Sequence, residues 1–93
     1  MKHNRHLEIE TQIKRLLVSE LKVNPALLEN TDPTMPLLGR GIGLDSVEAM
    51  ALLVSLEEEF GLAIPDDDLT VDLFESLGTL ADYIAHALLE RTT

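Results

Sequence analysis

Residues 23–44 carry three prolines and three glycines, and aliphatic residues recur at helical spacing on both sides of this segment. Proline and glycine at this density exclude a continuous helix. Nowhere do apolar and polar residues alternate as they do in a half-buried strand. We therefore predict an all-α fold, a small bundle of three main helices plus one short helix, with a long ordered loop after the first helix.

The expected elements follow from apolar periodicity and from start and stop signals. Asp45 and Glu48 have the spacing of a capping box, Gly61 is a stop signal, and Thr79 with Asp82 resembles a second capping box. The predicted single domain, residues 1–93, then contains a helix at about 6–22, a loop at 23–44, a helix at about 45–59, a short helix at about 68–76 and a last helix at about 79–89.

Composition limits both the core and the chemistry. The aromatic residues are Phe60, Phe74 and Tyr83, so the core must be mainly aliphatic. The chain has no cysteine, which excludes disulfides, thiolate metal sites and cysteine nucleophiles. The three acids from Asp66 to Asp68 lack the glycine and glutamate that a calcium loop needs further on. We expect no metal site.

Charge is unevenly distributed along the chain. The formal net charge is −10, and every Asp, Glu, Lys or Arg from Gly41 to Glu90 is acidic. Such a surface repels nucleic acid and favours partners with basic patches, although solubility alone also explains an acidic excess. No run of residues has the length and hydrophobicity of a membrane span or of a signal peptide. We expect a soluble cytoplasmic protein that does not insert into membranes.

The predicted second helix is apolar on two faces. The face with Ala49, Leu52 and Leu56 suits the core. A second apolar group follows a different face: Val47, Met50, Ala51 and Val54. Extra hydrophobic residues on a surface helix indicate a partner. The alternative is that the long loop half-buries Met50 and Val54.

Ser46 stands at the start of this helix without an evident catalytic partner. His3, His6 and His86 have no spacing that suggests a relay to Ser46, and the glycines of a nucleophile elbow are missing around it. We therefore predict no catalytic residue. A phosphate esterified to the Ser46 hydroxyl would instead be stabilised by backbone N–H groups and by the helix dipole.

Two motifs give the chain a family resemblance. The stretch Gly43-Leu44-Asp45-Ser46-Val47-Glu48 resembles the attachment signature G-x-D-S-[LIV] of acyl carrier proteins and related peptidyl carrier domains. The stretch from Leu56 to Asp67 is similar to the end of the family's second helix, L-E-x-x-F-x-x-x-I-P followed by acids. The resemblance extends from the first helix to Leu89.

The resemblance implies a non-catalytic carrier. A phosphopantetheinyl transferase would attach 4′-phosphopantetheine from coenzyme A to Ser46, with Asp45 and Gly43 at the attachment site. The thiol of the arm would hold an acyl or aminoacyl group as a thioester. The implied surface for loading and synthase enzymes with basic patches consists of Val47, Glu48, Met50, Ala51, Val54, Glu57 and Glu58. A monomer is the default for such a carrier.

Two departures from the family pattern bear on the pathway. Ala51 occupies a place where fatty-acid carriers often have an acid, and Gly39-Arg40-Gly41 lies where many have acids. These departures favour a specialised lipid, polyketide or amino-acid-loading pathway over housekeeping fatty acid biosynthesis. The alternative from another class is an unmodified acidic helical module that has the carrier fold and serves in protein–protein interaction. Retention of both Asp45 and Ser46 argues against that alternative.

Overall fold

The computed structural model describes the backbone of residues 2–29, 32–39 and 41–91 and, from Leu7 to Glu90, the side chains of these residues. This described part contains the helices α1 (Lys2–Leu21), α2 (Pro25–Glu29), α3 (Ser46–Phe60) and α4 (Leu77–Arg91). Two short 3₁₀ turns, η1 (Asp66–Asp68) and η2 (Val71–Phe74), join α3 to α4. The described residues form no strand, and the predicted all-α fold is confirmed.

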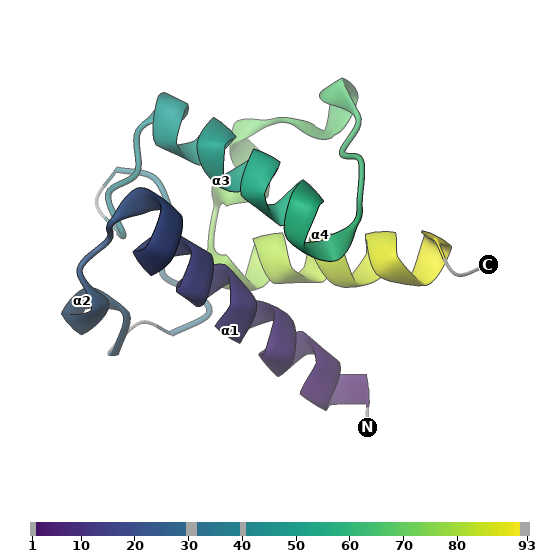
Figure 1. The fold of residues 1–93 in the computed structure, drawn as a ribbon, viewed down its shortest axis with the longest axis horizontal. Helices are drawn as coiled ribbons and strands as arrows, with labels where there is room; N and C mark the ends of the chain where they lie inside the picture. The colour runs from purple at the N-terminus through teal and green to yellow at the C-terminus, as the bar shows by residue number, and fades with distance from the viewer. Residues whose placement is uncertain (1, 30–31, 40, 92–93) are drawn as a thin grey trace.

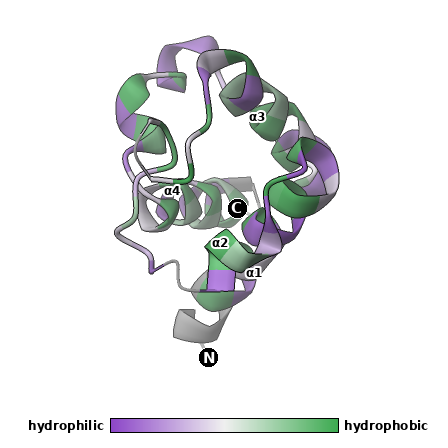
Figure 2. Cartoon of the chain, turned by 90° about the vertical axis from the view of Figure 1, so that its left-hand side faces the viewer, coloured by the Kyte–Doolittle hydropathy of each residue, from purple (hydrophilic) through white to green (hydrophobic). Residues whose placement is uncertain are grey.

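The three long helices enclose one aliphatic core. Helix α1 packs against both α3 and α4, and η2 packs against α4 (Figure 1). Both hydrophobic and hydrophilic residues occur along the helices (Figure 2), as expected of helices that bury one face. The largest fully buried side chains come from all three long helices and from one loop residue: Ile13, Leu17, Leu37, Leu52, Leu56, Leu77, Leu80 and Ile84.

Backbone hydrogen bonds join the segment that leads to α3 to η2 and to the start of α4. Leu37 is fully buried, and its N–H donates to the Phe74 carbonyl oxygen at 3.3 Å. The Leu44 N–H donates to the Leu37 carbonyl oxygen at 3.0 Å. The Gly78 N–H, at the start of α4, donates to the Pro33 carbonyl oxygen at 2.8 Å. These bonds hold the start of α3 in a fixed position relative to η2 and α4.

Glycines in this segment have structural duties. A Cβ atom at Gly41 would lie 1.8 Å from the Pro36 carbonyl oxygen, so only glycine fits there. Gly43 has φ +91°, a left-handed conformation that glycine adopts without strain. Gly41 is therefore required where two backbone segments meet closely.

The first helix and the segment after it differ from expectation in their bounds. Helix α1 begins at Lys2 rather than near residue 6, and it ends where Lys22 adopts φ +61°. The expected loop contains α2, which begins because the Asn24 side chain accepts the Ala26 N–H at 2.9 Å. Pro25 then occupies a first-turn position, where proline needs no N–H. An Asn-Pro pair that we interpreted as loop is therefore a helix start.

The C-terminal half differs in a similar way. The short helix expected at about 68–76 is two 3₁₀ turns, separated where Thr70 has an extended backbone. Helix α4 begins at Leu77 rather than at Thr79, because the Ser76 hydroxyl accepts the Thr79 N–H at 3.1 Å. Ser76, and not Thr79, therefore caps α4. Gly78 is inside the first turn, where a Cβ atom would lie 3.1 Å from the Pro33 carbonyl oxygen.

Candidate functional site

The start of α3 is fixed by a reciprocal cap. The Asp45 carboxylate accepts the Glu48 N–H at 2.8 Å, and the Glu48 carboxylate accepts the Asp45 N–H at 3.1 Å. The capping box expected from the sequence is therefore present. Both acids are engaged in holding the first turn, and Ser46 is the first helical residue between them.

Ser46 is exposed and stands beside a shallow apolar hollow. The volume of the hollow is about 190 Å³, and none of its lining residues is charged: Leu38, Ser46, Ala49, Met50, Leu69, Thr70, Val71 and Phe74. Leu38 comes from the loop before α3, while Leu69 to Phe74 come from η2 and the residues before it. The hydroxyl thus lies where α3, the loop and η2 meet.

The second apolar face of α3 is open to solvent. Val47 is 77 % exposed, Met50 47 % and Val54 51 %. Ala51 is also exposed. The inner face is buried, with Leu52 and Leu56 fully so. Leu38 of the loop lines the same hollow as Met50. Met50 and Val54 nevertheless keep about half of their surface exposed, which leaves this face accessible to a partner.

Glu57 and Glu58 play different parts at the end of α3. The Glu57 carboxylate accepts the Ile64 N–H at 2.7 Å, and the backbone carbonyl oxygen of Glu57 accepts the Leu62 N–H at 3.0 Å. Gly61 ends the helix with φ +67°. Glu57 therefore organises the turn after α3, whereas Glu58 is exposed. Sequence reasoning treated both as partner contacts and missed the structural role of Glu57.

Of the three histidines, His86 is the one whose side chain the structure describes. The imidazole of His86 lies on α4, and its Nδ1 is 2.9 Å from the Asp82 carbonyl oxygen. The His3 and His6 side chains, and Arg40, lie outside the described residues. Within the described range, no group of three or more His, Cys, Asp or Glu side chains is arranged to hold a metal ion. Nor is any helix there long and apolar enough to cross a membrane.

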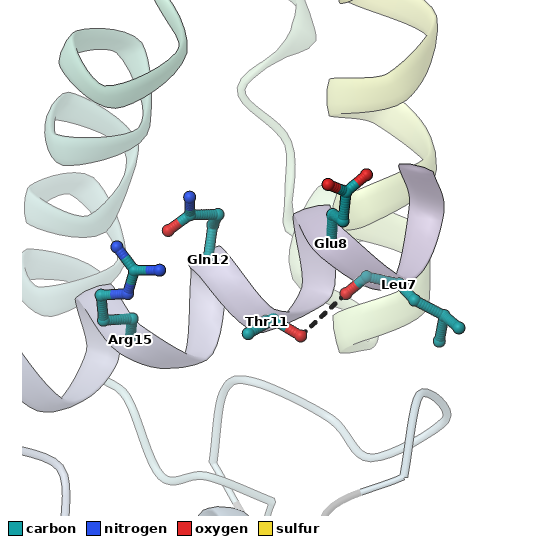
Figure 3. A pocket seen from close by; sticks show the side chains of 5 residues that line it. All are labelled: Leu7, Glu8, Thr11, Gln12 and Arg15. Atoms are coloured by element: carbon teal, nitrogen blue, oxygen red, sulfur yellow. Dashed lines mark hydrogen bonds between the residues drawn. The ribbon is translucent and has the colours of Figure 1, made fainter. Parts of the chain in front are cut away.

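A second hollow lies on α1 and shares no lining residue with the first. Its volume is about 300 Å³, and Figure 3 shows the side chains that line it: Leu7, Glu8, Thr11, Gln12 and Arg15. The Thr11 hydroxyl donates to the Leu7 carbonyl oxygen at 2.9 Å. All five residues come from one helix, whereas the hollow at Ser46 is built from three segments.

Comparison with known protein families agrees with this geometry. Residues 11–84, most of the chain, match the family model described as the phosphopantetheine attachment site. The chain belongs to this family of phosphopantetheine-carrying carrier proteins, which bind 4′-phosphopantetheine covalently. Carrier domains of the family work with phosphopantetheinyl transferases and synthase enzymes.

The residues around Ser46 fit this prosthetic group. Attachment needs a hydroxyl that a transferase reaches, and Ser46 is exposed at a helix N-terminus that favours a phosphodiester. Gly43 is exposed two residues before the helix cap. Sequence reasoning missed Leu69, Thr70 and Val71, which line the hollow beside Ser46. No local motif marks them, because η2 reaches α3 only through the packing of the domain.

Proposed function

We propose that Ser46 carries 4′-phosphopantetheine and that the chain serves as a non-catalytic carrier of acyl or aminoacyl groups. One observation carries the proposal. In a chain of the phosphopantetheine attachment family, Ser46 is an exposed hydroxyl at the capped start of α3, inside the motif Gly43-Leu44-Asp45-Ser46-Val47. The family of the chain and the exposure of Ser46 support the same serine.

The residues around Ser46 hold it ready for a separate enzyme. In the phosphopantetheinyl transferase reaction, the Ser46 Oγ would attack the pantetheine-bearing phosphorus of coenzyme A. The P–O bond to adenosine 3′,5′-bisphosphate would break, this leaving group would take the electron pair, and a base of the transferase would take the hydroxyl proton. Asp45 and Glu48 keep the first turn of α3 formed, and Gly43 lets the chain turn into the cap. When attached, the group supplies a thiol that holds the cargo as a thioester.

The partner enzymes contact the outer face of α3. Its exposed apolar residues are Val47, Met50, Ala51 and Val54, and Glu58 adds negative charge toward its C-terminal end. Glu48 and Glu57 stay in the proposal as part of this face, although their carboxylates also accept backbone N–H groups. Basic patches on loading and synthase enzymes complement the acids. We propose a monomer, because a carrier must present the same face to several enzymes.

The uncharged middle of α3 favours a specialised lipid, polyketide or amino-acid-loading pathway. Ala51 is exposed there, so an acid at this position would have been accessible to a partner. The alternative function, an unmodified interaction module, would use the same exposed face without the Ser46 hydroxyl. The cytoplasmic location expected from the sequence stays a prediction.

The test is intact mass after incubation with coenzyme A and a broad-specificity phosphopantetheinyl transferase, with Ser46→Ala as the control. We expect the wild-type chain to gain one phosphopantetheine group and the Ser46→Ala chain to gain none. If folded wild-type chain gained no mass with several transferases, the interaction module would be the better explanation.

A further inference from the structure

The outer face of α1, opposite the face that enters the core, carries two adjoining hollows. The hollow drawn in Figure 3 is lined by residues of α1 alone. A further hollow of about 320 Å³ lies between α1 and α2, where Val18 and Leu28 supply apolar lining. Thr11 and Arg15 line both hollows, which therefore adjoin along the helix. We call the two hollows together the α1–α2 groove.

The groove holds cations in its middle. The structure describes three Lys and Arg side chains, and all of them lie on α1 or directly after it: Lys14, Arg15 and Lys22. Lys14 and Arg15 line the groove, and neither forms an ion pair with a residue that the structure describes. Glu8 lines the groove toward the start of α1, and Glu29 lines it from α2. Two available cations therefore lie between an acid at each end.

The charge of the remaining surface selects the partner. Every Asp, Glu, Lys or Arg from Gly41 to Glu90 is acidic, so α3, η1, η2 and most of α4 repel an acidic protein. An acidic partner is thereby directed to α1, whereas an enzyme with basic patches is directed to α3. The two kinds of partner do not compete for one surface.

The length and lining of the groove suit a helix. From Leu7 to Val18 the groove follows α1 for about 16 Å, which is about three helical turns. Leu7 is 57 % exposed at one end, and Val18 and Pro25 line the other. A short amphipathic helix laid along the groove would place apolar side chains against these residues and acids beside Lys14 and Arg15.

We propose that the α1–α2 groove binds an acidic amphipathic helix of a partner protein, at a surface separate from the outer face of α3. Ion pairs with Lys14 and Arg15 orient the bound helix, and burial of the apolar lining contributes to its affinity. Such a partner leaves α3 free for the enzymes that act on the cargo. The proposal does not depend on attachment at Ser46, because the groove shares no lining residue with the hollow beside Ser46.

The test is fluorescence anisotropy of a labelled synthetic helix titrated with the full chain. The acidic probe has leucine at positions i, i+3, i+4 and i+7 and glutamate on its other face, and the matched probe has lysine in place of glutamate. We expect Arg15→Glu to raise the Kd of the acidic probe at least about fivefold. The matched control, Lys22→Glu, makes the same charge change outside the groove and should raise the Kd less than about twofold. Circular dichroism checks that both variants are folded.

NMR of the chain labelled with nitrogen-15 locates the contact. We expect the acidic probe to shift the amides of Thr11, Val18 and Leu28 and the lysine probe to leave them unchanged. Shifts confined to α3, or equal effects of Arg15→Glu and Lys22→Glu, would overturn the groove as the binding site.

The remaining outcomes separate this proposal from the carrier function. Ser46→Ala should bind the acidic probe as tightly as the wild-type chain does. If the wild-type chain bound the acidic probe no better than the lysine probe, the groove proposal would fail and attachment at Ser46 would still stand. A wild-type dimer that Arg15→Glu dissociates would assign the groove to a second copy of the chain instead.

Discussion

At the level of single residues, the acids of α3 divide into structural and exposed groups. Asp45 and Glu48 bind each other's backbone N–H groups, and the Glu57 carboxylate binds the Ile64 N–H. Glu58 and Glu59 are exposed. The sequence shows three glutamates in a row, but only the first of them holds the turn that follows the helix.

Replacing Glu57 tests this division. Glu57→Ala should lower the free energy of unfolding by about 1 kcal/mol more than Glu58→Ala, because only Glu57 accepts a backbone N–H from the following turn. Both variants lose one charge from the same helix end, so the difference between them isolates the hydrogen bond. Urea denaturation followed by circular dichroism measures it. Equal stabilities would show that the bond contributes nothing.

At the level of elements, the start of α4 and the loop before α3 depend on each other. The Ser76 hydroxyl caps α4, and the next two N–H groups bond to the loop, Leu77 to Met35 at 3.3 Å and Gly78 to Pro33 at 2.8 Å. One end of the loop is therefore fixed by α4, and its other end leads to Ser46. A weaker α4 start loosens the segment that positions the site.

The cap at Ser76 gives a second prediction. Ser76→Ala should lower the free energy of unfolding by about 1 kcal/mol, because it leaves the Thr79 N–H without its side-chain acceptor. Ser76→Asp, which offers a carboxylate oxygen at the same position, should restore most of the loss. Thermal or urea unfolding of the three chains measures the effect. No recovery in Ser76→Asp would mean that packing around Ser76 matters more than capping.

At the level of the whole molecule, a small aliphatic core opposes a large like charge. The formal net charge is −10, and exposed acids follow one another at the end of α3 and in η1. Repulsion between them disfavours the compact state and weakens as ions screen it.

Added salt should therefore raise the melting temperature. Moving from low to moderate ionic strength should stabilise the fold by about 1 kcal/mol, which corresponds to about 4–8 °C in a domain of this size. Magnesium chloride should act at lower concentration than sodium chloride, because divalent cations screen adjacent carboxylates more strongly. Differential scanning calorimetry measures both series. A flat or falling melting temperature would contradict the role of repulsion between Glu58, Glu59 and the acids of η1.

Local patterns were sufficient for much of the fold. The capping box at Asp45 and Glu48 and the outward direction of Val47, Met50 and Val54 follow from residues a few positions apart on one helix. Local patterns failed where two signals compete. Asn24-Pro25 begins a helix rather than a loop, and Ser76, not Thr79, caps α4.

The sequence by itself determined the all-helical class, the capped helix start at Ser46 and the two apolar faces of α3. Helical periodicity and capping depend on residues within one or two turns, so local patterns are enough to predict them. Only the tertiary structure decided that Gly41 is needed for its contact with Pro36, that Ser76 starts α4 against the loop, and that Val71 lies beside Ser46. These relations join segments whose relative positions are fixed by burial of the shared aliphatic core, and no local pattern encodes them.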